Sequence, residues 1–392
     1  MDSSNKEFNL IQIFSIFIII ISLAAIIFIS NKVGLFKNFL KNPQSIFTTV
    51  PKDNCGYSKA TLNWLDSKRS KTNKYFISVK CNYKEKKCNI GQESGQSGHN
   101  DMPIIWARYK YIQKTGDKDE IAKLKKDIDI YSQQLELMEV QNNFWNCRML
   151  LEMNDEKILG SDYVDKVHQL CLTSSYLGSE DVKNKFDEKT GLNPQVIRTV
   201  DYFDWQNLEE SRKKYSTIDK NIGGDYSTFV TYPSDFVARY KYNQDKEDLN
   251  IANTYFNKLL IESYINSANF SAQDRCLLAI SSLDLYSVNQ DQKYLDWSKK
   301  VHNFYFKDNG VKSEAKNVNC ALFNRELGKY DNDSKYQKIQ DNLLGDFVSM
   351  YWDGGSSPRK FSNEGGFFIL NEESATSKNL KENALIVNLL CQ

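Results

Sequence analysis

Two helices of different character follow one another between Asn100 and Gln134. From Met102 to Ile112, apolar residues occupy nearly every side of a helix, and a helix that is apolar all round must be buried all round. Gly116 can end this helix and Asp117 can cap the next one. In the second helix, apolar residues recur three or four positions apart among lysines and aspartates: Ile121, Leu124, Ile128, Tyr131 and Leu135. The pattern predicts a hairpin of one inner and one outer helix.

The hairpin recurs along the chain as a degenerate repeat, with turns at intervals of about 40 to 46 residues. The turns are expected at Gly116-Asp117, Gly160-Ser161-Asp162, about Asp204, Gln244-Asp245, Gln290-Asp291 and Gly328 to Asp331. The last helix, Leu380 to Leu390, is also apolar all round, and packing against a short helix from Tyr57 to Lys68 would close the ring. We therefore predict an all-α fold, an (α/α)6-type toroid over residues 55–392. Six or seven hairpins both fit this pattern.

The segment before the first hairpin has a different pattern. Tyr75, Ile77 and Val79 alternate with other residues as in a strand, and Cys81 and Cys88 enclose a polar turn. This predicts a small N-terminal β-hairpin. A disulfide between Cys81 and Cys88 is geometrically easy there, and two free thiols are the alternative.

The chain begins with a long apolar run. From Phe8 to Ile29 there is no charged residue, and at about 1.5 Å per residue the run is long enough to cross a hydrocarbon core of about 30 Å. We interpret residues 8–30 as an uncleaved transmembrane anchor between an N-terminal tail, 1–7, and a linker, 31–54. A cleaved signal peptide is the alternative.

The orientation of this anchor is set by two opposing tendencies. Lys32, Lys37 and Lys41 follow the span, which by the positive-inside tendency would keep the toroid in the cytoplasm. Long domains, however, translocate largely regardless of charge. We predict a single-pass membrane protein with a signal-anchor and an extracytoplasmic toroid.

Composition excludes few functions. Of the 392 residues, 41% are hydrophobic and 26% are charged, which is ordinary for a globular protein. Lys and Arg number 51 against 50 Asp and Glu, so the net charge of +1 offers no field that would gather nucleic acid. We therefore expect no nucleic-acid partner.

Eight cysteines permit four disulfides without proving any. Four of them lie within apolar helix patterns and are expected to be small buried hydrophobes: Cys147, Cys276, Cys320 and Cys391. No two cysteines have the C-x-x-C spacing. We therefore predict neither a metal site nor a redox cofactor.

Several segments together resemble a known superfamily. They are the Trp64-Leu65 helix, the strand pair, and the inner helix Ala107-Arg108-Tyr109-Lys110-Tyr111 followed by Thr115-Gly116-Asp117. This combination resembles the (α/α)6 toroid superfamily of glycoside hydrolases, polysaccharide lyases and sugar epimerases. The segment from Asn379 to Leu385 resembles its closing helix. The resemblance is architectural, and no single family's catalytic signature matches.

The resemblance implies a site where the inner helices begin, and Asp101, Asp235 and Asp274 lie there. Inverting glycosidases place two carboxyl groups about 6.5 to 9.5 Å apart, one as the acid and one as the base. We expect Asp235 to be the acid, because the ring of Tyr232 can keep a carboxyl group protonated, and Asp101 to be the base. The structural alternative for all three aspartates is helix capping.

Other residues are expected to bind substrate around this pair. They are His99, Asn100, Tyr232, Asp274 and Trp352. Polar residues beside a helix start also act as caps, and aromatic residues at helical spacing also form core. Two function classes follow from the sequence: a membrane-anchored glycosidase that hydrolyses glycans with paired carboxylates and no cofactor, or a non-catalytic surface toroid that binds glycan or protein.

Overall fold

The computed structural model describes residues 51–70, 76–77, 79–82, 87–90, 101–137, 146–171, 229–265, 270–307, 310–355, 361–362, 364–371 and 374–391. All of these fall within one unit of the chain, Pro51–Gln392. The predicted span from Phe8 to Ile29, the turn near Asp204, and both His99 and Asn100 lie outside the described residues. Within the described part, no helix is both long enough and apolar enough to cross a membrane.

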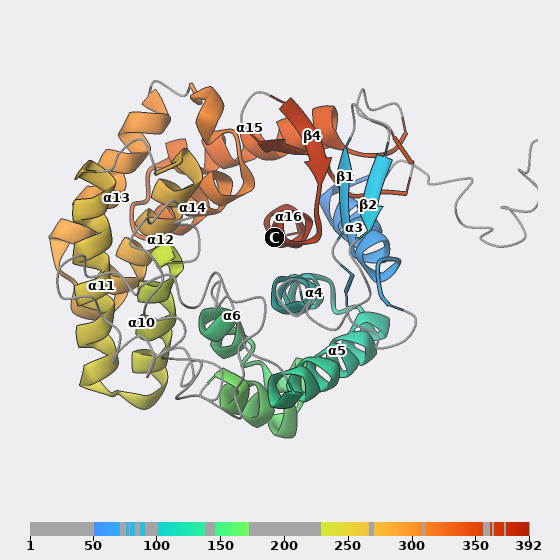
Figure 1. Ribbon diagram of the computed structural model, residues 1–392, viewed down its shortest axis with the longest axis horizontal. Helices are drawn as coiled ribbons and strands as arrows, with labels where there is room; N and C mark the ends of the chain where they lie inside the picture. Colours follow the sequence, from blue (N-terminus) through green and yellow to red (C-terminus); the bar gives the residue numbers. More distant parts are fainter. Residues whose placement is uncertain are drawn as a thin grey trace, which may run out of the picture. The chain divides into compact units, whose positions relative to one another are not determined.

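Six inner helices of the described chain form a closed ring (Figure 1). They are α4 (Asp101–Thr115), α6 (Asn146–Glu152), α10 (Tyr232–Asn243), α12 (Ala272–Asn289), α14 (Val318–Gly328) and α16 (Leu380–Leu390). Each helix packs against the next in this order, and α16 packs against α4. Because α6 packs directly on α10, the inner helices of the described chain close into a ring of six.

Most outer helices pack on the inner helix that precedes them in the chain. The outer elements are α5 (Lys118–Leu137), a helix over residues 161–171, α11 (Lys246–Ile265), α13 (Gln292–Tyr305), α15 (Ser334–Tyr351) and α3 (Asn54–Asp66). Three short segments connect them: α7 (Glu156–Leu159), η4 (Phe229–Thr231) and η7 (Ser313–Ala315). As predicted, α3 packs against α16, so the first helix of the toroid completes the last hairpin.

The turns inside the hairpins follow from local chemistry. Gly116 adopts a φ of 67°, a left-handed conformation that costs glycine little, and the side chain of Asp117 accepts from the backbone N–H groups of Asp119 and Glu120. Gln244 and Gln290 are left-handed at the ends of α10 and α12. Helices therefore end and begin at these turn positions where the sequence placed them.

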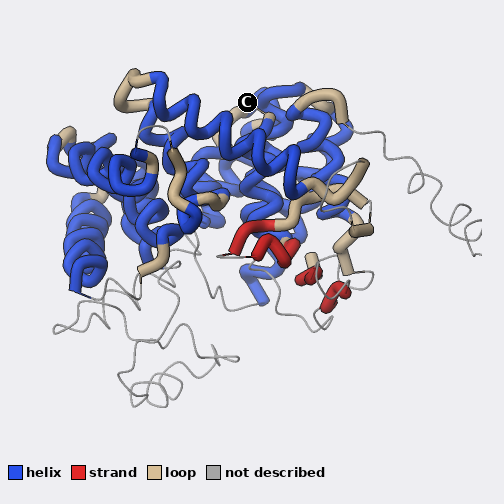
Figure 2. The backbone as a smooth tube through the Cα atoms, turned by 90° about the horizontal axis from the view of Figure 1, so that it is seen from above, coloured by secondary structure: helices blue, strands red, loops and turns tan. Residues whose placement is uncertain are grey.

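A four-stranded antiparallel sheet joins the two ends of the toroid. Its order is β2 (Lys87–Ile90), β1 (Val79–Asn82), β4 (Ser374–Lys378), β3 (Ile369–Asn371). Figure 2 shows these strands together on one side of the helices. The β1–β2 hairpin confirms the prediction, but the sequence analysis missed the β3–β4 hairpin. Because β4 leads directly into α16, the sheet lies where the inner helices begin.

All eight cysteines form disulfides: Cys55–Cys391, Cys81–Cys88, Cys147–Cys171 and Cys276–Cys320. The predicted Cys81–Cys88 bridge lies across the β1–β2 pair, where the two residues face each other. The expectation for Cys147, Cys276, Cys320 and Cys391 was wrong. They are buried, but each is bonded to a cysteine on another helix, a pairing that helical periodicity cannot reveal.

We predict that the Cys55–Cys391 bridge stabilises the toroid most, because it locks α3 onto the end of α16 across 336 residues of chain. Loop-closure entropy gives about 6 kcal/mol for such a loop, against about 2 kcal/mol for the 7-residue separation of Cys81 and Cys88. Denaturant unfolding of the Cys55→Ala/Cys391→Ala and Cys81→Ala/Cys88→Ala variants measures the difference. Equal losses of unfolding free energy in the two variants would show that the long bridge restrains the unfolded chain no more than the short one does.

Candidate functional site

Asp101 and Asp235 begin two of the inner helices. Asp101 is the first residue of α4, and Asp235 lies in the first turn of α10. Both side chains are buried, with 3% and 5% of their surface exposed. Oδ1 of Asp101 accepts from the backbone N–H of Phe76 at 3.4 Å, which ties it to the segment before β1. Both carboxyl groups therefore lie at the sheet end of the ring.

The hydroxyl group of Tyr131 connects the two aspartates electrostatically. Tyr131 comes from the outer helix α5 and is buried; its hydroxyl group accepts from Asn146 Nδ2 at 3.3 Å at the start of α6. Burial raises the pKa of Tyr131, and the charges of Asp101 and Asp235 raise it further. Tyr131 therefore lies within electrostatic reach of both aspartates when they are ionised.

Asp235 has an environment that favours its neutral form. Its Oδ1 accepts from the backbone N–H of Arg148 at 3.0 Å, and Oδ2 has no hydrogen-bond partner among the described residues. Burial raises the pKa of Asp235 well above its usual value and outweighs the backbone N–H groups and the charge of Arg148, which lower it. A buried carboxyl group that favours its neutral form has a property required of a general acid.

The same contacts also allow a structural role for Asp235. The backbone N–H groups of Cys147 and Arg148, both in the first turn of α6, bind its carboxyl group. Such N–H groups have no partner inside their own helix, so Asp235 caps α6. Asp274 is a cap as well, since it forms a capping box with Ser271 at the start of α12. Capping, the alternative that the sequence left open, therefore holds for Asp274.

Two aromatic residues expected to bind substrate are core residues instead. Trp352 is 3% exposed and packs between the rings of Tyr57 and Phe367, each with a centroid 4.9 Å away. Tyr232 is 4% exposed and packs edge-on against Tyr255. Both expectations fail for the same reason, because an aromatic residue next to a helix end can pack inward as easily as outward.

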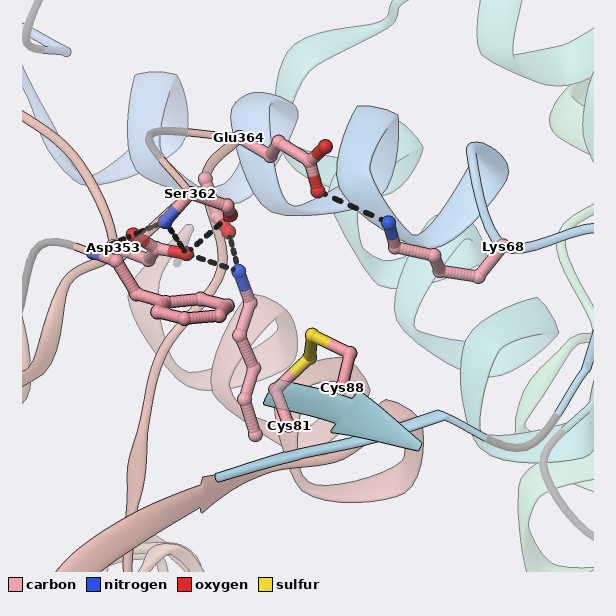
Figure 3. Close-up of a disulfide and its surroundings, with 9 residues drawn as sticks. Lys68, Cys81, Cys88, Asp353, Ser362 and Glu364 are labelled. Atoms are coloured by element: carbon pink, nitrogen blue, oxygen red, sulfur yellow. Dashed lines mark hydrogen bonds and ion pairs between the residues drawn. A yellow bond between two sulfur atoms is a disulfide. The ribbon is translucent and has the colours of Figure 1, made fainter. Parts of the chain in front are cut away.

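The glycine-rich loop after Trp352 is held by a buried ion pair. Asp353 accepts from the backbone N–H of Phe361 and from both the N–H and the hydroxyl group of Ser362, and it pairs with Lys378 Nζ at 2.9 Å. Burial lowers the pKa of Lys378 to about 8. Figure 3 shows this loop beside the Cys81–Cys88 bridge, where Glu364 also pairs with Lys68. The described part of the loop is therefore held to β4 and to the residues that follow α3.

Tyr131 and Arg148 were not predicted as site residues from the sequence. Tyr131 fell in the apolar stripe of an outer helix, where periodicity predicts only packing. Arg148 is a charged residue inside an apolar helix pattern, and that signal was available, since buried charges are rare unless they are paired.

Solved structures of glycosidases have the same fold. No protein-family model matches the chain, and no curated protein matches it. An α-1,6-mannanase of glycoside hydrolase family 76 from Salegentibacter sp. superposes with a TM-score of 0.59 at 13% identity, over 86% of this chain and 97% of that one. An unsaturated glucuronyl hydrolase specific for heparin gives 0.56 at 10%, over 86% and 95%. A family 76 mannosidase from Bacteroides thetaiotaomicron gives 0.52 at 10%, over 86% and 97%.

The chain has the (α/α)6 toroid fold of these glycosidases. At such low identity the likeness establishes the fold alone. The mannanase structure with mannotetrose is an inactive variant in which two consecutive aspartates are replaced by alanine. This chain has no two consecutive aspartates anywhere in its sequence, and its Asp101 follows Asn100. Any pair of catalytic carboxyl groups here must therefore come from separate positions or include a glutamate.

We predict that the Asp235→Asn variant becomes more stable relative to the wild type as the pH rises. The raised pKa means that folded Asp235 keeps its proton above about pH 4, where the unfolded side chain loses it. The stability of the wild type therefore falls as the pH rises from the unfolded pKa towards the folded one, by up to about 1.4 kcal/mol per unit. An amide at this position has no proton to lose, so melting curves from about pH 4 to about pH 8 should favour the variant increasingly.

Glu326→Gln is the matched control for this measurement. Burial would raise the pKa of Glu326, but Arg325, Arg148 and Lys329 outweigh it and hold the pKa well below its usual value. Its stabilising contribution is present above the unfolded pKa and is lost as the pH falls, so this variant should become relatively less stable as the pH rises. If the stability of both variants relative to the wild type changed with pH in the same direction, a neutral Asp235 would be refuted.

Proposed function

We propose that this protein is a membrane-anchored, extracytoplasmic glycan hydrolase in which Asp235 is the general acid and Asp101 the general base. The observation that carries the proposal is the burial of two carboxyl groups, Asp101 and Asp235, in the first turns of inner helices at the sheet end of the ring. The glycosidase fold supports it.

The chemistry requires two carboxyl groups in different protonation states. Asp235, favoured in its neutral form by burial, donates a proton to the glycosidic oxygen as the leaving group departs. Asp101, as a carboxylate, takes a proton from the water that attacks the anomeric carbon. Tyr131 interacts with both groups and is held by Asn146, so it is placed to orient the sugar or the water.

Two substrate classes are the first to test. The mannanases among the structural neighbours were solved with α-1,6-mannotriose and α-1,6-mannotetrose, and another neighbour is an unsaturated glucuronyl hydrolase specific for heparin. We propose α-1,6-linked mannooligosaccharides as the substrate, because family 76 enzymes recur among the neighbours. A glucuronide would need cationic partners, and the arginine described beside Asp235, Arg148, is already paired with carboxylates of the protein.

The proposed compartment rests on the cysteines and the apolar run. All eight cysteines are in disulfides, and disulfides persist in oxidising compartments. The run from Phe8 to Ile29 supplies a membrane anchor in this proposal. The toroid would therefore lie outside the cytoplasm, where extracellular glycans are found.

We predict that the full-length protein cleaves α-1,6-mannotetrose and that Asp235→Asn and Asp101→Asn each reduce kcat at least about 100-fold, because general acid and base catalysis contribute about that much. Product chromatography measures the rates. The wild-type rate should fall at high pH as Asp235 loses its proton. Asp274→Asn is the control, because Asn still caps α12, and it should keep near wild-type activity. Cleavage that survives both substitutions would eliminate this site.

A non-catalytic glycan-binding toroid is the second candidate. The absence of consecutive aspartates favours it, since replacing such a pair gave an inactive mannanase that still held its oligosaccharide. Calorimetric titration with α-1,6-mannotetrose distinguishes the two candidates. Binding to the wild type without any cleavage would establish the second and remove the first.

We predict that intact cells expose the toroid. Because the disulfides need an oxidising compartment, a protease added to cells expressing the full chain should digest residues 57–392 without permeabilisation. A reductant in the same assay should speed digestion by opening the Cys55–Cys391 bridge. A toroid that is protected until the membrane is opened would contradict the proposed orientation.

A further inference from the structure

Arg148 contacts Asp235 through its backbone and three other inner-ring carboxylates through its side chain. Its backbone N–H donates to Asp235 Oδ1 at 3.0 Å. Its Nε lies 3.3 Å from Asp284 Oδ2 and 3.6 Å from Glu152 Oε1, and its Nη2 lies 3.3 Å from Glu326 Oε2. A single residue of α6 therefore connects α10, α12 and α14.

This network is buried and nearly fixed in place. The side chains of Arg148 and Glu326 are 9% and 7% exposed, and Glu326 is also bound by Arg325 and Lys329. A buried guanidinium held by several carboxylates cannot leave without stranding their charges. The backbone of Arg148 is therefore held at the point where it meets Asp235.

We infer that Arg148 is the positioning residue for the proposed acid. Its backbone N–H holds one carboxyl oxygen of Asp235 in place. Its guanidinium group, together with the carboxyl group of Asp284, sets the electrostatic potential at Asp235. The inference rests on the proposed function, since Asp235 needs positioning only if it reacts. Arg148 itself does not contact substrate in this account. Its side chain brings positive charge to a carboxyl group that also has Asp284 of α12 as a neighbour. Burial raises the pKa of Asp284 as well, against the charge of Arg148, which lowers it.

The described charges around Asp235 can be named element by element. From α6 comes Arg148, from α12 Asp284, from α5 Tyr131, and from α4 Asp101, which acts on the same tyrosine. On the other side of α10, α11 brings Asp248, which is paired with Arg239 at 3.1 Å. Segment η4, also packed on α10, carries no titratable residue. Arg148, which lowers the pKa of Asp235, and Asp284, which raises it, are therefore the side-chain charges to test.

Two substitutions test the inference because they act in opposite directions. Arg148→Met keeps the backbone N–H and removes the positive charge, so the pKa of Asp235 should rise by about one unit or more. Asp284→Asn removes the neighbouring negative charge, so the same pKa should fall. Loss of folding stability alone cannot produce shifts of opposite sign.

The measurement compares each variant with the same variant carrying Asp235→Asn. The difference in melting temperature between these two proteins is followed as a function of pH. The pH range over which this difference changes reports the pKa of Asp235 without any assay of activity. If the wild type cleaves glycans, the high-pH limb of its rate profile should move with this pKa, upward for Arg148→Met and downward for Asp284→Asn.

Arg108→Met is the matched control. Arg108 is a buried arginine on α4 that also contacts three carboxylates, those of Asp66, Glu120 and Asp127. Its loss should destabilise the protein without moving the pKa of Asp235. If Arg148→Met does not fold, Arg148→Lys, which keeps the charge, should leave the pKa nearly unchanged, and Asp284→Asn still tests the sign.

Opposite shifts for Arg148→Met and Asp284→Asn, with none for Arg108→Met, are the expected result. Shifts in one direction, or no shift for either variant, would overturn the inference. If the shifts appear but no glycan is cleaved, the hydrolase proposal fails while the charge relation between Arg148 and Asp235 stands. The two failures are therefore distinguishable.

Discussion

Closure of the inner ring by α16 is the constraint on which the other features depend. The inner helices are apolar on nearly every side, so a ring left open would expose the faces of α4 and α14 to water. α16 fills that gap between them, and α3 covers it from outside. The Cys55–Cys391 bridge and the pairing of β1 with β4 reinforce the same closure, so two ends of the toroid far apart in sequence hold the ring together.

A closed ring also determines how its charges behave. Arg148, Asp235, Asp284 and Glu326 lie on four successive inner helices and are largely withdrawn from water, where electrostatic interactions are stronger and unpaired charges cost more. One guanidinium cannot neutralise three carboxyl groups equally. Glu326 has additional cations and stays ionised, whereas burial favours a proton on Asp235. Asp235 and Glu326 thus differ in protonation because different charged side chains surround them, and the packing of the inner helices determines those neighbours.

The sequence predicted what short-range rules control. Helix turns at Gly116-Asp117 and Gln290-Asp291 need only a left-handed residue and a cap, and the burial of α16 follows from its composition. It predicted the local Cys81–Cys88 bridge but not the pairing of Cys276 with Cys320, because these two lie on different helices. The β3–β4 hairpin was missed because its Ser-Ala-Thr-Ser-Lys strand lacks apolar alternation and is held by pairing with β1. Asp101 and Asp235 were chosen for their place at helix starts, whereas Tyr131 and Arg148 emerge only from contacts between helices.

The proposed acid catalysis requires that Asp235 be a neutral carboxylic acid at neutral pH. Infrared difference spectroscopy between the wild type and Asp235→Asn measures this directly. The account predicts that the wild type shows the C=O stretch of a protonated carboxylic acid at neutral pH, and that the variant lacks it. A wild-type spectrum that shows only ionised carboxylate at this position would contradict the account, because a charged Asp235 has no proton to donate.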